Sequence, residues 1–215
     1  MTGTARPAGC PPAPREPYPV TGDDLRAAGA AVQQLFARVP DGAAAVPTLG
    51  TDVVGVAAHI TSCLTWYAQD LVAGPVEVSA FDVVRRPDAD LAETCQQLGA
   101  ATEVLARVVD TAGPAERGVH DWGLADASGF AGMGCAELLL HTGDVAADRE
   151  LDWTPPSRLA EATRARLFPW APADADPWAA LLWATGRGEL PGREPVTSWR
   201  WHCAPLSEWD GTQPR

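Results

Sequence analysis

Apolar residues recur at helical spacing in four stretches of the chain, and segments containing Pro or Gly separate these stretches. Each stretch opens near a Ser, Thr or Asp, the residue types that cap helix N-termini. The pattern therefore predicts four helices, which begin near Thr21, Thr51, Asp88 and Ser128 and end before Pro40, Gly74, Gly113 and Pro155.

The links between these helices differ in length. Helices one and two are joined by a short segment, whereas residues 72–87 between helices two and three are long enough to cross a bundle. Short links favour antiparallel neighbours, and a long link allows a parallel pair. We therefore predict an all-α fold, a four-helix bundle with one long crossover over residues 21–152. Only residues 76–84 show alternation of the kind typical of a strand.

The composition changes after the predicted bundle, where seven of the nine Trp residues lie from Trp153 onward. Two shorter helices are predicted there, at residues 156–167 and 177–185, with Gly186 as the C-cap of the second. Segments rich in Trp need an apolar surface to pack on. We expect residues 153–215 to form an extension that packs on the bundle, and residues 1–20 to form a Pro-rich tail.

The charge and the cysteines limit the classes of partner. The formal net charge is -12, a field that repels phosphate backbones and anionic lipids, so we expect no nucleic-acid partner. No apolar run reaches the roughly 20 residues of a membrane span, and no signal peptide is expected at the Pro-rich start. Five scattered cysteines without a CxxC motif predict reduced thiols and a cytoplasmic location.

Two histidines lie in the middle of predicted helices and suggest a metal site. Glu137 and His141 are four residues apart, so both side chains lie on one helix face, and His59 lies at the centre of the second helix. Three such ligands leave an open fourth position, as in a catalytic zinc site. Imidazole and carboxylate ligands also suit Fe, Ni or Mn. The alternative is a salt-bridged Glu137–His141 pair beside a hydrogen-bonded core histidine.

Five further residues are candidates, each with an alternative. Asp52 and Asp144 could orient the metal-bound imidazoles, although Asp52 also suits a helix N-terminus and Asp144 could pair with an Arg. His120 is a candidate acid or base, or a surface histidine. Cys63 is a ligand, a reactive thiol or a small core residue. Arg187 could bind a carboxylate of a cofactor or substrate, or serve a helix C-terminus.

Two segments of the chain resemble a known family. Residues 51–60 (TDVVGVAAHI) and 136–146 (AELLLHTGDVA) look like the DinB-like superfamily, and more narrowly like the N-terminal domain of mycothiol-dependent maleylpyruvate isomerases. That family has an Asp and, seven residues on, a His in helix two, and a Glu-x-x-x-His-x-x-Asp block in helix four. The matching positions are Asp52, His59, Glu137, His141 and Asp144. Residues 179–187 (AALLWATGR) are similar to a block toward the C-terminus of family members.

The resemblance implies a divalent metal held by His59, Glu137 and His141, and a low-molecular-weight thiol such as mycothiol as cosubstrate. Such a metal lowers the pKa of the thiol, and the thiolate adds to an electrophilic carbon. The first hypothesis is therefore a metal- and thiol-dependent transferase or isomerase for a small electrophilic metabolite, active as a monomer or homodimer.

Two rival hypotheses remain. One is a helical bundle that binds a metal or ligand without turnover, and the other is a structural bundle in which Glu137 and His141 pair without a metal. An open metal position at the base of an apolar pocket would favour the enzyme. A fourth protein ligand, or a position plugged by the Trp-rich extension, would favour the binding protein.

Overall fold

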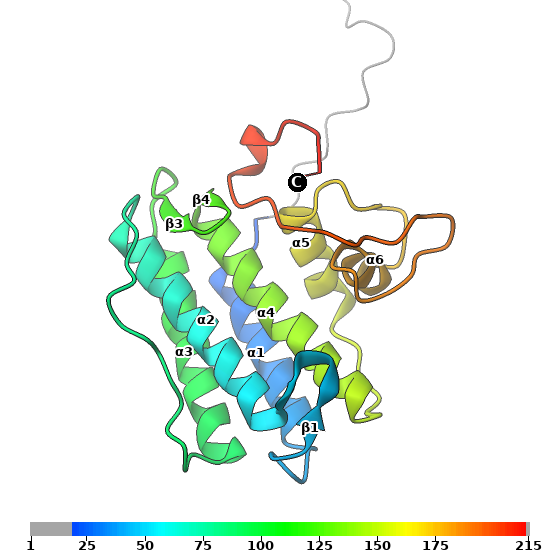
Figure 1. Cartoon of the computed structure of the whole chain (residues 1–215). Coiled ribbons are helices and arrows are strands. Elements are labelled where there is room, and N and C mark those ends of the chain that lie inside the picture. The colour runs from blue at the N-terminus through cyan, green and yellow to red at the C-terminus, as the bar shows by residue number, and fades with distance from the viewer. Residues whose placement is uncertain (1–18, 214–215) are drawn as a thin grey trace, which may run out of the picture.

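The computed structural model describes residues 19–213, and this part of the chain is mostly helical (Figure 1). Within it six α-helices pack together, and they are α1 (Gly22–Phe36), α2 (Val53–Ala73), α3 (Leu91–Thr111), α4 (Ala127–Asp148), α5 (Ser157–Leu167) and α6 (Pro177–Ala184). The mostly helical fold predicted from the apolar spacing is confirmed. The predicted tail over residues 1–20 lies outside the described residues, apart from its last two.

Aspartate side chains set the starts of three long helices. Asp52 accepts the Gly55 N–H at 2.7 Å before α2, and Asp126 accepts the Gly129 N–H at 2.8 Å before α4. Before α3, Asp90 accepts the Glu93 N–H at 2.8 Å. Each contact satisfies a backbone donor that the first helical turn leaves free, so the helix begins at a defined residue.

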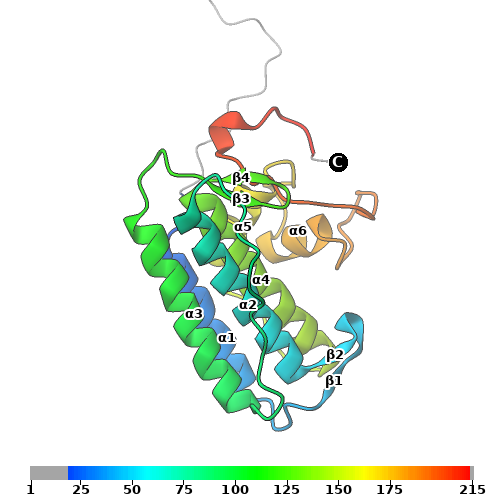
Figure 2. The ribbon, with the colours of Figure 1, turned by 60° about the vertical axis from the view of Figure 1, so that its left-hand side comes forward.

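The four long helices lie side by side, with α2 and α3 running in one direction and α1 and α4 in the other (Figures 1 and 2). The Val20 N–H at the start of α1 donates to Ser128 at the start of α4, at 3.0 Å. Between α2 and α3 the chain returns along α2, where the Ser62 hydroxyl donates to the Val83 carbonyl at 3.1 Å. This return places the first turn of α3 beside the end of α1 that precedes α2.

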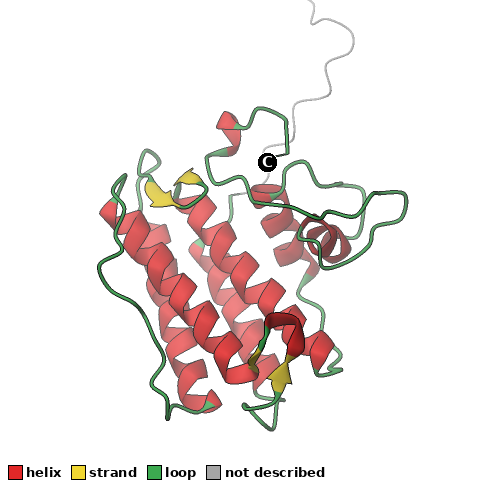
Figure 3. Ribbon diagram, in the orientation of Figure 1, coloured by secondary structure: helices red, strands yellow, loops and turns green. Residues whose placement is uncertain are grey.

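Two small hairpins are the strands of the described chain (Figure 3). β1 (Ala45–Val46) pairs with β2 (Thr51–Asp52) around a 3-10 turn, and β3 (Gly118–His120) pairs with β4 (Gly123–Ala125). Residues 76–84, whose alternation is typical of a strand, form none. Phe81 there is 81% exposed, and a segment without a neighbouring strand cannot build a ladder.

The residues after 153 pack on the long helices through an apolar core and a buried arginine. Phe168, Leu181 and Trp201 are buried in the same core as the long helices. Arg166, also buried, donates to Asp126 at 2.6 Å and to the Cys203 carbonyl at 3.0 Å. The division at residue 152 into a bundle and an extension stays a prediction. Within residues 19–213 no helix is both long and apolar enough to cross a membrane.

Candidate metal centre

Three of the sequence-predicted residues meet where α2 lies against α4. His59 comes from α2, and Glu137 and His141 come from one face of α4. The Nε2 atoms of His59 and His141 lie 3.4 Å and 3.1 Å from the same oxygen, Oε2 of Glu137. The two imidazole rings are 4.9 Å apart between centroids and nearly perpendicular. Two nitrogen donors and one oxygen donor therefore converge on a single point.

The oxygen at this point has no partner with good hydrogen-bond geometry. Oε2 of Glu137 is buried, and among the described residues none donates to it with hydrogen-bond geometry, although the two imidazole nitrogens lie at 3.4 and 3.1 Å. Buried carboxylate oxygens without a partner are rare and costly. Tetrahedral zinc with bonds of about 2.0–2.1 Å places its N and O ligands about 3.3 Å apart, which is close to both distances. The residues present therefore fit a divalent metal.

The charges at the centre are coupled. Burial by itself would raise the pKa of Glu137, but the imidazoles of His141 and His59 outweigh it and lower this pKa to about 2. Burial would likewise lower the pKa of His141, yet Asp144 and Glu137 raise it to about 9. Without a metal, a proton on His141 thus balances the buried carboxylate. A divalent cation could replace that proton.

Asp144 holds His141 from behind. Its Oδ2 lies 3.2 Å from Nδ1 of His141, and Arg187 donates to both of its oxygens at 3.0 and 3.1 Å. Although burial would raise the pKa of Asp144, His141 and Arg187 lower it, so the group is a carboxylate that accepts the Nδ1 hydrogen. The other ring nitrogen, Nε2, is then directed toward Glu137. Arg187 is engaged with Asp144 in this arrangement.

Tyr67 also belongs to the centre, although the sequence alone did not predict this. Its buried hydroxyl donates to Oε1 of Glu137 at 3.2 Å, so one carboxylate oxygen is held and the other faces the histidines. Burial and the charge of Glu137 raise the pKa of Tyr67, which keeps the hydroxyl protonated as a donor. The spacing of the sequence could have indicated it, because residues 59, 63 and 67 lie one turn apart on one face of α2.

Cys63 is the middle residue of that face. Its sulfur lies 3.6 Å from Nε2 of His59, and donor atoms of His59, Cys63 and Glu137 all lie within 4.8 Å of one another. These three residues could hold a metal ion. Burial and the charge of Glu137 raise the pKa of the Cys63 thiol, so it stays protonated unless a cation binds beside it.

The structure places Asp52 and His120 outside this cluster. Asp52 caps α2, and its role in orienting an imidazole stays a prediction. His120 lies in β3, with its ring 5.8 Å from that of Tyr67 and 5.7 Å from that of Trp201. Burial lowers the pKa of His120, and its Nδ1 accepts the Trp122 N–H at 3.1 Å. His120 thus contacts the centre through Tyr67.

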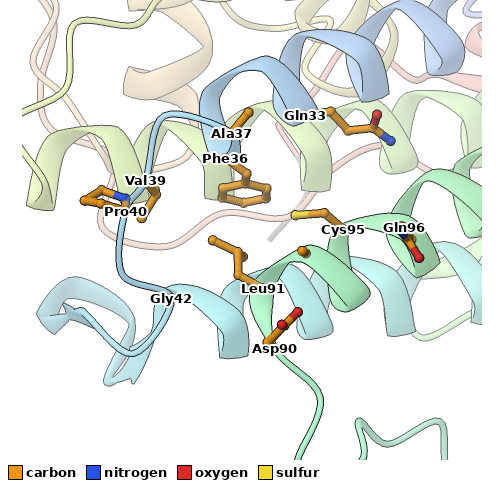
Figure 4. A pocket seen from close by; sticks show the side chains of 11 residues that line it. Gln33, Phe36, Ala37, Val39, Pro40, Gly42, Asp90, Leu91, Cys95 and Gln96 are labelled. Carbon is orange, nitrogen blue, oxygen red and sulfur yellow. The ribbon is translucent and has the colours of Figure 1, made fainter.

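A groove of about 570 Å³ lies between the end of α1 and the start of α3 (Figure 4). Phe36, Leu91 and Cys95 form its apolar floor, and Gln33 and Gln96 stand at its rim. None of the residues that line this groove belongs to the metal centre. The centre instead opens to solvent beside His59, whose side chain is 54% exposed.

We compared the chain with known protein families, curated proteins and solved structures. No protein family, no curated protein and no solved structure matches this chain. The resemblance to DinB-like proteins thus stays a hypothesis, supported by the residues of this chain alone.

Proposed function

We propose that this chain is a divalent-metal protein of the DinB-like kind, with His59, Glu137 and His141 as ligands and zinc as the first candidate, before Fe, Ni and Mn. One observation carries the proposal: two Nε2 atoms converge on a buried carboxylate oxygen that has no aligned donor among the described residues. Two imidazoles and a carboxylate are a donor set that zinc accepts with a fourth position open.

The proposed activity is a thiol-dependent transfer or isomerisation of a small electrophilic metabolite in the cytoplasm. When bound, the metal lowers the pKa of a small thiol such as mycothiol, so that a nucleophilic thiolate is present at neutral pH. The protein's own residues hold the ligands: Tyr67 fixes one oxygen of Glu137, and Asp144 fixes the tautomer of His141. The exposed edge of His59 gives a small molecule access from solvent.

The helix arrangement supports the same proposal. The parallel run of α2 and α3, joined by a long return segment, supports a bundle with one crossover. The ligands come from α2 and α4, the helices in which the DinB-like motifs lie.

A second candidate function is metal binding without turnover. Cys63 favours it, because its sulfur lies 3.6 Å from Nε2 of His59 and could occupy the position that an enzyme needs open. The two candidates share the metal and differ in whether a small thiol reaches it.

The first experiment measures the metal content of the purified chain by mass spectrometry, beside a variant with His59, Glu137 and His141 all changed to Ala. We expect near-stoichiometric metal in the native chain and none in the variant. Assays of the loaded protein with small thiols and electrophiles then separate the two candidates. A native chain that carries no metal and takes up none on titration would refute the metal centre.

A further inference from the structure

We propose that Cys63 is a fourth ligand of the metal held by His59, Glu137 and His141, so that the resting centre has two nitrogen, one oxygen and one sulfur donor. This inference rests on the metal centre proposed above. It joins two overlapping sets of donors, one predicted by sequence and one found by geometry, which share His59 and Glu137.

The separation between Cys63 and His59 fits a shared ion. A zinc–sulfur bond of about 2.3 Å and a zinc–nitrogen bond of about 2.0 Å at tetrahedral angles place S and N about 3.5 Å apart. Sγ of Cys63 lies 3.6 Å from Nε2 of His59 and 4.0 Å from Nδ1. The sulfur is therefore nearer to the nitrogen that also faces Glu137, on the side where the other donors converge.

The position of Cys63 on α2 supports its role as a metal ligand. It follows His59 by one turn and precedes Tyr67 by one turn, so the residue lies between a donor to the centre and the residue that holds Glu137. Cys135, by comparison, is fully buried among apolar residues and behaves as core. Cys63 is only half-buried, and its sulfur lies beside the imidazole of His59.

A sulfur ligand has two chemical consequences. A thiolate with two imidazoles selects zinc or cobalt over magnesium, calcium or manganese, which prefer oxygen. It also occupies the position that an external thiol would need. Cys63 would therefore regulate access to the centre, since a small thiol has to compete with a sulfur that the helix holds in place.

The test is cobalt(II) substitution followed by absorption spectroscopy. Tetrahedral cobalt gives visible bands, and a sulfur ligand adds a charge-transfer band in the near ultraviolet. We compare the native chain with Cys63→Ser and with Cys95→Ser, a matched control from the distant groove (Figure 4). We expect the near-ultraviolet band in the native chain and in Cys95→Ser, and its loss in Cys63→Ser with the visible bands retained. The dissociation constant of Cys63→Ser should rise at least about tenfold, since loss of even an outer partner of a ligand costs roughly 10–100-fold.

Alkylation of the native chain provides a check without a substitution. Cobalt(II) should slow iodoacetamide labelling of Cys63, measured by mass spectrometry, and leave labelling of Cys95 unchanged. Visible bands without a sulfur band, or a sulfur band that survives in Cys63→Ser, would refute the ligand role and leave the metal centre standing. Failure of the native chain to take up cobalt(II) would refute both.

Discussion

The Tyr67 hydroxyl gives the two carboxylate oxygens of Glu137 different environments. It donates to Oε1 at 3.2 Å, while Oε2 faces the nitrogens of His59 and His141. A carboxylate held at one oxygen cannot rotate freely, so the free oxygen is presented in a fixed direction. This contact links a residue of α2 to a proposed ligand on α4.

Replacing Tyr67 with Phe removes this donor and keeps the ring. We expect metal affinity to fall by roughly 10–100-fold, the usual cost of losing a partner that orients a ligand. Competition with a chromophoric chelator measures the affinity. Thr61→Val on the same helix is the control, because within residues 19–213 the Thr61 hydroxyl bonds to the Ala57 carbonyl alone. An unchanged affinity in Tyr67→Phe would show that Glu137 needs no support.

Metal binding should depend on pH through His141. Its pKa is raised to about 9 in the metal-free protein, so a metal must displace a proton over most of the accessible range. The apparent affinity should rise about tenfold per pH unit between pH 7 and 9, since each binding event releases about one proton. Calorimetric titration in two buffers of different ionisation enthalpy counts the protons. A count near zero at pH 7 would contradict this assignment.

The ion pairs of His141 with Glu137 and Asp144 stabilise the metal-free fold in a defined pH range. A histidine whose folded pKa lies above its unfolded value contributes fully below about pH 6.5, and that contribution is lost as pH rises through 9. Asp144→Asn removes one of its two acidic partners. We expect it to lower the free energy of unfolding by about 1–3 kcal/mol at pH 6, and by less at pH 9.5. Urea titrations at both pH values measure the difference, and equal losses at both would assign the effect to the lost contacts with Arg187 instead of His141.

Asp70 is expected to destabilise the native chain at neutral pH. Burial, with a smaller effect from Asp121, raises its pKa to about 6. The folded state therefore binds more protons than the unfolded state between about pH 4 and 6, and stability falls as pH rises through this range. Asp70→Asn should raise the free energy of unfolding at pH 7.5 by about 1–2 kcal/mol, a figure reduced for partial exposure, and change little at pH 3.5. Asp82→Asn, in an exposed position, is the control.

Arg166 should hold the C-terminal segment on the long helices. Its side chain is 3% exposed and joins Asp126 to the backbone near Cys203. Arg166→Ala removes the buried guanidinium from the partly exposed Asp126 and from the Cys203 carbonyl, so we expect a loss of about 1.5–3 kcal/mol in the free energy of unfolding. Limited proteolysis should then cut after residue 190 faster than in Arg193→Ala, an exposed control. Equal cleavage in both variants would show that Arg166 does not hold the C-terminal segment on the long helices.

Local signals predicted the helices, because a helix depends on spacing and caps within its own sequence. The end of α2 at Ala73 and the extent of α5 follow from such signals. The alternation in residues 76–84 was misleading, since a strand needs a partner that no local pattern supplies. The two hairpins at residues 45–52 and 118–125 went unpredicted for the converse reason: each is too short to show a period.

The candidate centre was predictable where its chemistry is unusual for a helix interior. A histidine in an apolar face and a Glu four residues before a His stand out in sequence, and the fold brings His59, Glu137 and His141 together. Cys63 and Tyr67 did not stand out, because small thiols and aromatic rings are ordinary members of a buried face. Their roles depend on which helix packs opposite them, which is a property of the tertiary structure.

Because His59 and Glu137 belong to helices that are distant in sequence, an ion shared between them would be a cross-link. It would fasten α2 to α4 much as a disulfide fastens two strands, but reversibly and in proportion to the free metal concentration. A ligand present at 100 times its dissociation constant stabilises a fold by about 2.7 kcal/mol. The melting temperature of this protein would then depend on the free metal concentration around it. Removal of the metal by a chelator would weaken the contact between α2 and α4 first.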